Sequence, residues 1–153
     1  MEKSPPNAIR SRWLQSVFKN SYFIGLSRDG RAVAEGIYRR RNIPIVKGIA
    51  QWIKANTIML DDSVFLKNFK LVRYEDLVDN PSNVIRDLFH FIGVDPEECQ
   101  IDFQSKFKTS NIDHKNSPII NFNQKSFDRI PPDVFKEISV TIQPVMKRLG
   151  YLV

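Results

Sequence analysis

Cysteine is almost absent from this sequence, because Cys99 is the one thiol among 153 residues. A lone cysteine excludes an internal disulfide and any zinc or iron–sulfur site built from several thiolates, so we predict no metal centre. No apolar run approaches the roughly 18 residues that a membrane span needs. The start, Met-Glu-Lys-Ser-Pro-Pro, lacks the basic and apolar stretches of a secretory signal. These absences predict a soluble, cytoplasmic protein.

Positive charge is in excess, with 23 Lys and Arg against 17 Asp and Glu, a net charge of +6 and a pI of about 9.5. Such a balance suits an anionic partner, but it does not choose between nucleic acid, membrane lipid and a small molecule that carries phosphate. The length fits one domain over residues 1–153, which can bury roughly 70% of its unfolded surface. There is no internal repeat.

The hydrophobic pattern predicts alternating strands and helices. Short apolar runs at 22–26 and 69–72 are typical of strands in a parallel sheet that is buried on both faces. Asp29-Gly30 predicts a tight turn after the first run. Apolar residues at helical spacing predict helices over residues 4–18, 31–41, 44–60, 80–93 and 131–150. This alternation favours an α/β fold with a parallel sheet.

Three features of these elements are expected in more detail. The first helix should bury one stripe, formed by Ile9, Trp13, Leu14, Val17 and Phe18. Pro144 should kink the last helix. Residues 94–130 show no sustained period and are expected to form a long loop, either a lid or binding loop or a disordered segment.

The stretch 22–41 says most about chemistry, because a strand runs directly into Ser27-Arg28-Asp29-Gly30-Arg31 and then a helix. Ligands bind at the carboxyl ends of parallel strands, where a helix N-terminus offers unpaired N–H groups to an anion. Arg28 can present a planar fork to a phosphate. On the helix, Arg40 leans back over Gly36, four residues earlier. We predict a small anion pocket formed by Arg28, Gly36 and Arg40.

The residues alone also permit a plainer interpretation. Residues 39–41 could be a solvated run of arginines that the helix dipole favours near a C-terminus. Arg28 and Asp29 could form a surface ion pair of little energetic value.

Three segments resemble sulfotransferases, enzymes that use 3′-phosphoadenosine 5′-phosphosulfate (PAPS). Phe23-Ile-Gly-Leu-Ser-Arg-Asp-Gly-Arg-Ala-Val-Ala resembles their strand–turn–helix for the 3′-phosphate. Arg73-Tyr-Glu-Asp-Leu-Val, Asn80-Pro81 and Leu88-Phe-His-Phe-Ile-Gly are similar to their second diagnostic stretch, and Met146-Lys-Arg-Leu-Gly-Tyr to their C-terminal helix. The resemblance covers residues 2–93 and 131–151, and it is nearest to protein-tyrosine sulfotransferases and their bacterial relatives.

The resemblance implies a three-layer parallel sheet of the P-loop nucleotide-binding type and transfer of a sulfuryl group from PAPS to a hydroxyl acceptor. It assigns Arg28 and Arg40 to the 3′-phosphate, Tyr74 to the neighbourhood of the adenine, and Lys3 to the bridging oxygen of the sulfuryl group. From the residues alone, Tyr74 could equally be a core tyrosine and Lys3 a frayed terminal lysine. Gly36 stands where the family has a serine, so one hydroxyl donor is lost.

The sequence also departs from the family at its front. No phosphate-cradling loop precedes Lys3, so we expect an N-terminally truncated fold, either a fragment or an inactive member. Pro5 stands where cytosolic sulfotransferases place a histidine base. His90, expected on the apolar side of its helix, and His114, in the long loop, are weak candidates for that role.

Several alternatives therefore stay open. The chain could be a pseudoenzyme that binds the nucleotide without catalysis. A nucleotide kinase-like protein is disfavoured because the sequence has no Gly-x-x-x-x-Gly-Lys-Ser/Thr loop. A nucleic-acid-binding module would account for the charge, but no motif of that class is present, so we expect no nucleic-acid partner. The acceptor has no readable code, and an uncovered sheet edge could make the chain a homo-oligomer.

Overall fold

The computed structural model describes residues 2–96 and 120–152. Contacts divide the chain into two compact units, Met1–Tyr74 with Phe122–Val153, and Glu75–Asn121. The elements of the first unit are η1 (Pro5–Ile9), α1 (Ser11–Val17), β1 (Phe23–Ser27), α2 (Gly30–Arg41), α3 (Ile45–Ser63), β2 (Phe69–Arg73), α6 (Asn123–Phe127) and α7 (Pro132–Arg148). Helix α4 (Tyr74–Asp79) begins at the boundary between the units, and α5 (Pro81–Ile92) belongs to the second.

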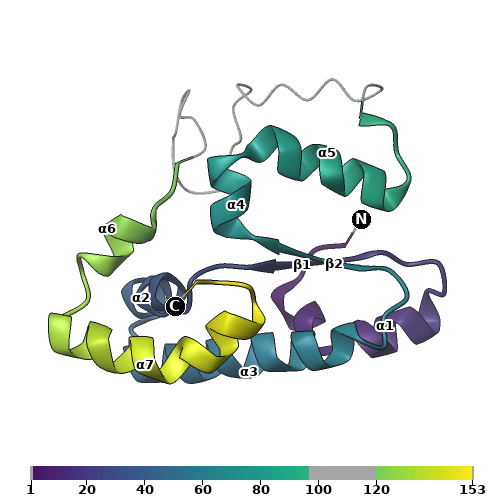
Figure 1. Ribbon diagram of the computed structural model, residues 1–153. Coiled ribbons are helices and arrows are strands. Elements are labelled where there is room, and N and C mark those ends of the chain that lie inside the picture. Colours follow the sequence, from purple (N-terminus) through teal and green to yellow (C-terminus); the bar gives the residue numbers. More distant parts are fainter. Residues whose placement is uncertain (1, 97–119, 153) are drawn as a thin grey trace. The chain divides into compact units, whose positions relative to one another are not determined.

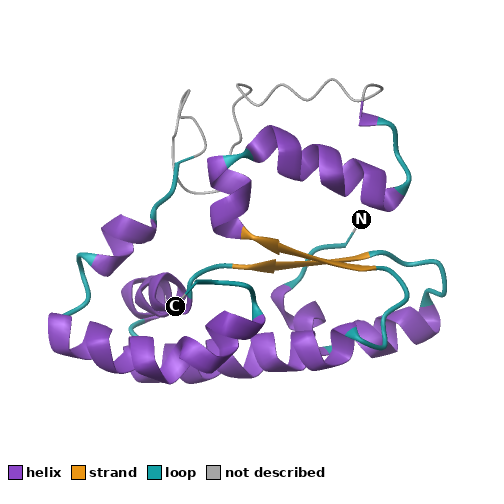
Figure 2. Ribbon diagram, viewed as in Figure 1, coloured by secondary structure: helices purple, strands orange, loops and turns teal. Residues whose placement is uncertain are grey.

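Strands β1 and β2 lie side by side and run in the same direction, as the two arrows of Figure 2 show. Phe23 is paired with Phe69 at one end, and Ser27 with Arg73 at the other. Helices α2 and α3 form the connection between the strands, because parallel neighbours need a long crossover. The prediction of an α/β fold with a parallel sheet is confirmed.

The core of the first unit lies where α2, α3 and α7 meet, and Figure 1 shows α7 running alongside α3. Helices α2 and α3 approach closely, since a Cβ at Gly48 would lie only 3.1 Å from the Cα of Ala34. The helix predicted over residues 131–150 is confirmed, and it buries Ile138, Ile142, Val145 and Met146 in this core. The buried core consists of Ala34, Ile49, Trp52, Met59, Ile130, Ile138, Ile142, Val145, Met146 and Leu149.

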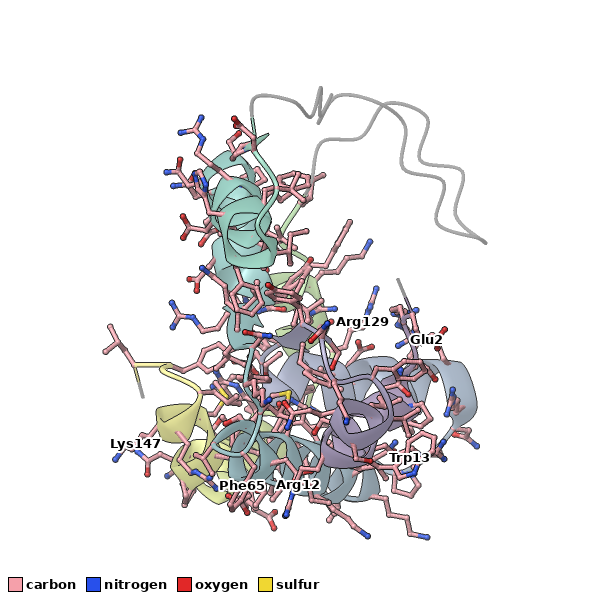
Figure 3. The ribbon with its side chains drawn as sticks, turned by 90° about the vertical axis from the view of Figure 1, so that its right-hand side faces the viewer. Glu2, Arg12, Trp13, Phe65, Arg129 and Lys147 are labelled. Carbon is pink, nitrogen blue, oxygen red and sulfur yellow. The ribbon has the colours of Figure 1, made fainter. Side chains whose placement is uncertain are left out.

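The sequence was wrong about burial near the N-terminus. Trp13 is 62% exposed and Phe18 is 60% exposed, so the predicted buried stripe faces outward. The residue that α1 buries is Ser11, whose hydroxyl donates to the Asp62 carboxylate at 3.4 Å. Helix α1 therefore meets α3 through a polar contact. Figure 3 labels Trp13, Arg12 and Phe65. The guanidinium carbon of Arg12 lies 4.4 Å from the centroid of the Phe65 ring.

The apolar run of β1 predicted a strand buried on both faces, and this prediction is wrong. Gly25 and Ser27 are buried, whereas Ile24 is 45% exposed and Leu26 is 59% exposed. The small residues face α3, where the Ser27 hydroxyl donates to the Asn56 side chain at 3.0 Å. Close approach of α3 thus requires the small side chains, and the large ones point the other way.

Element boundaries differ at several places. Asp29-Gly30 is the start of α2 rather than a separate turn, and α3 continues through Asp61-Asp62 to Ser63. Helix α4 was not predicted, and α6 lies within the range 94–130 that was expected to be a loop. Residues 97–119 of that range lie outside the described residues. Helix α7 runs through Pro144 to Arg148, and among the described residues no helix combines the length and apolarity needed to cross a bilayer.

Two glycines of α2 offer a matched test of this packing. A Cβ at Gly30 would lie 2.9 Å from the Trp52 ring, so we expect Gly30→Ala to destabilise the fold by about 1–3 kcal/mol. A Cβ at Gly36 would meet only the Arg40 Nη2 atom at 3.5 Å, so Gly36→Ala should stabilise by about 1 kcal/mol through helix propensity. Urea denaturation measures both. Equal changes in the free energy of unfolding would contradict the close approach of Trp52.

Candidate functional site: the turn between β1 and α2

Asp29 begins the site by capping α2. Its carboxylate is buried and accepts a hydrogen bond from the backbone N–H of Arg31 at 2.9 Å. The same carboxylate pairs with the Arg31 guanidinium. Phe127 and Phe135 cover that guanidinium, with ring centroids 5.0 and 4.9 Å from its carbon. The partner of Asp29 is therefore Arg31, and the surface ion pair considered for Arg28 and Asp29 is wrong.

Arg28 follows the last residue of β1 and is held by three other elements. Its carbonyl accepts a hydrogen bond from the Trp52 indole of α3 at 2.9 Å. Its Nε donates to the Oδ1 atom of Asn123, the first residue of α6, at 2.8 Å. Its guanidinium carbon lies 4.5 Å from the centroid of the Tyr74 ring. Both the backbone and the side chain of Arg28 are thus fixed in orientation.

One donor of Arg28 is left over. The Nη2 atom is buried and makes no hydrogen bond within the chain. A buried polar group without a partner costs about 1–3 kcal/mol, and more when the group is charged. Such an atom in a native fold is explained where a bound ion or ligand supplies the missing acceptor. The turn between β1 and α2 therefore contains a buried, positively charged donor whose acceptor is not supplied by the described residues.

Gly36 and Arg40 meet as the sequence predicted. The Arg40 side chain folds back along α2, and its Nε donates to the Gly36 carbonyl at 3.0 Å. Residues 39–41 are exposed, as the alternative of a solvated run expects. Arg39 and Arg40 nevertheless have defined partners on their own helix, since Arg39 pairs with Glu35 at 3.2 Å.

Glu35 is a charged residue that the sequence analysis missed. It is only 2% exposed, and its Oε1 atom accepts from Arg39 and, at 3.4 Å, from Arg129. Its Oε2 atom is buried without a partner. The spacing of Glu35 and Arg39 is the favourable order for an ion pair on a helix, but no local signal indicates the contact with Arg129.

The structure brings the predicted site residues together in pairs. One pair is Arg28 with the ring of Tyr74, and the other is Arg40 with Gly36. The Tyr74 hydroxyl also accepts a hydrogen bond from the Phe122 N–H at 3.4 Å. Tyr74 is half-buried rather than a core residue. Within residues 2–96 and 120–152, no hydrogen bond or ion pair joins the first pair to the second.

The remaining candidates lie apart from these pairs. Lys3 is exposed and, in the described part of the chain, has no hydrogen bond or ion pair with Arg28, Arg40 or Tyr74. His90 was expected on the apolar side of its helix, but it is exposed on α5. His114 lies outside the described residues. No group of three or more metal-ligating side chains occurs among the residues that the structure describes.

Comparisons with known proteins identify the fold and the family of the chain. A solved sulfotransferase domain from the curacin biosynthetic pathway superimposes with a TM-score of 0.69 at 22% identity, over 99% of this chain and 62% of that one. This likeness shows that the fold is that of a sulfotransferase domain.

Curated relatives point the same way. Protein-tyrosine sulfotransferase A of Caenorhabditis elegans is 26% identical over 168 residues, which cover 97% of this chain and 44% of that protein. Protein-tyrosine sulfotransferase 2 of Gallus gallus is 24% identical over 171 residues, 97% of this chain and 45% of that protein. The chain thus spans less than half the length of these relatives. The model of the sulfotransferase family matches residues 1–98, which is more than half of this chain. The chain therefore belongs to the sulfotransferase family.

Proposed function

We propose that this chain binds the 3′-phosphate of PAPS and serves the transfer of its sulfuryl group to a hydroxyl acceptor. The observation that carries the proposal is Arg28, whose buried Nη2 atom has no hydrogen-bond partner. A phosphate oxygen is a suitable acceptor for this N–H group, because a guanidinium binds phosphate through paired N–H groups. Membership of the sulfotransferase family supports a 3′-phosphorylated nucleotide as the source of that phosphate.

Charge at the turn supports an anionic ligand. The buried Asp29 carboxylate neutralises the Arg31 guanidinium, and it already occupies one N–H group of the α2 N-terminus. Asp29 and Arg31 cancel each other's charge, so this pair neither attracts nor repels a second anion. The charge of Arg28 has no such partner among the residues that the structure describes, so we assign phosphate recognition to its guanidinium and not to the helix terminus.

Tyr74 and Arg40 complete the proposed nucleotide contacts. Arg28 covers one face of the Tyr74 ring, so the rest of this half-buried ring would meet the adenine. The Arg40 guanidinium lies over the small Gly36 and would add a second cation to the 3′-phosphate. Gly36 offers the phosphate no hydroxyl donor.

In the proposed reaction an acceptor oxygen bonds to sulfur while the bond between sulfur and the bridging phosphate oxygen breaks. The hydroxyl loses its proton to a base, and adenosine 3′,5′-bisphosphate leaves. We assign Lys3 to the bridging oxygen, because a compact ammonium stabilises the negative charge that develops there.

We expect Arg28→Ala to lower the affinity for adenosine 3′,5′-bisphosphate by roughly 10- to 150-fold, the loss of one hydrogen bond between charged groups. Calorimetric titration of the 153-residue chain measures the effect. Arg12→Ala is the matched control, since Arg12 is an exposed arginine that stacks on Phe65. An unchanged affinity in Arg28→Ala would refute the assignment of the phosphate site.

Gly36→Ser should restore the missing donor. The open space beside Gly36 accepts a Cβ, and the serine hydroxyl would lie near Arg40 and the phosphate. We expect this variant to bind adenosine 3′,5′-bisphosphate roughly tenfold more tightly than Gly36→Ala, which gains helix stability without a hydroxyl. Equal affinities of the two variants would show that position 36 does not face the phosphate.

A second candidate function is nucleotide binding without transfer. The exposure of Lys3 favours it, because an ammonium group in water stabilises developing negative charge less than one in a site that excludes water.

Turnover of labelled PAPS with a panel of hydroxyl acceptors separates the two candidates. If the chain transfers, Lys3→Ala should lower the turnover rate by about 10²–10³ and leave the affinity for adenosine 3′,5′-bisphosphate unchanged. Lys19→Ala, which changes another exposed lysine, is the control. Wild-type binding without release of product would favour the second candidate.

A further inference from the structure

An arginine can hold a phosphate in two ways. The side-on mode uses Nε together with one Nη group, whereas the end-on mode uses the two Nη groups. The modes place the phosphate on different edges of the guanidinium. Which edge is available therefore determines where the phosphate lies.

At Arg28 the side-on edge is already occupied. The Nε atom donates to the Oδ1 atom of Asn123 at 2.8 Å. Asn123 is itself only 7% exposed, so water does not compete freely for its amide. The donor that stays buried without a partner is Nη2, which lies beside Nε on the side-on edge and beside Nη1 on the end-on edge. Because Nε is already bonded, the end-on pair of Nη groups is the paired mode that remains.

Asn123 is held in place by its own segment. Helix α6 lies beside α2 (Figure 1), with Ser126 and Ile130 buried against the first unit. Three residues beyond Ser126, Arg129 donates to the buried Glu35 of α2 at 3.4 Å. The segment that carries Asn123 is therefore attached to α2 along α6 and just beyond its C-terminal end, and the amide is a fixed acceptor.

From this arrangement we infer that Asn123 is a positioning residue of the nucleotide site: it holds Nε of Arg28, so that the 3′-phosphate is met end-on by the Nη groups. The inference rests on the proposed function, in which Arg28 binds that phosphate. The Tyr74 ring, 4.5 Å from the guanidinium carbon, restricts the remaining rotation of the fork. Preorganisation of this kind raises affinity because less side-chain freedom is lost on binding.

The test compares two ligands on the full chain, adenosine 3′,5′-bisphosphate and adenosine 5′-monophosphate, which lacks the 3′-phosphate. We expect Asn123→Ala to weaken binding of the bisphosphate roughly five- to tenfold, the loss of one oriented hydrogen bond, and to leave binding of the monophosphate unchanged. Asn123→Asp preserves the shape of the side chain. It should weaken binding of the bisphosphate more than Asn123→Ala does, because its carboxylate neutralises the charge of Arg28. Gln124→Ala is the control, since Gln124 is an exposed amide bonded to Asp128.

The outcomes separate this inference from the proposed function. If the wild-type chain does not prefer the bisphosphate, both are wrong. If it does, and Arg28→Ala abolishes the preference while both Asn123 variants keep it, only the role of Asn123 is wrong. Equal weakening of both ligands in the Asn123 variants would indicate a purely structural role and would also overturn the inference. Asn123→Asp keeps the comparison valid if Asn123→Ala does not fold.

Discussion

The fixed guanidinium of Arg28 is the feature on which the candidate site depends. Its carbonyl is held by Trp52 of α3, its Nε by Asn123 of α6, and its planar face by Tyr74. Each of these partners comes from a different part of the chain, so the first unit must fold before the fork takes this orientation. The buried Nη2 atom shows that the fold meets the cost of an unsatisfied charged donor at this turn.

The net charge of +6 is a poor guide to this site. Arg31, three residues after Arg28, lies equally close to the turn, yet its charge is neutralised by Asp29 and covered by two aromatic rings. Glu35 similarly offsets one of the two positive charges of Arg39 and Arg129, which both contact it. Buried carboxylates thus offset part of the local positive charge, and the proposed recognition of an anion rests on single guanidinium groups rather than on a basic surface.

The sequence predicted what depends on local pattern. Apolar periodicity located β1, β2, α2, α3, α5 and α7, and helical geometry correctly placed Arg40 over Gly36. The partner of Arg28 could not be predicted in this way, because Asn123 is 95 residues away and lies in a stretch without periodicity. Periodicity also failed at Trp13 and Phe18, since a stripe of apolar residues does not specify whether another element covers it. Contacts between distant polar residues leave no local signal, and the site is built from them.

Gly36 makes the orientation of Arg28 more important here than it would be with a serine at that position. A hydroxyl at residue 36 would share the recognition of a phosphate between several weak donors, so the angle of any one of them would matter less. With glycine, the open space beside Arg40 contains no such donor. In the proposed function, affinity for the phosphate then depends on guanidinium groups, whose strength comes from paired and well-aligned N–H donors. The role proposed for Asn123, which accepts from Nε, is to maintain this alignment at Arg28.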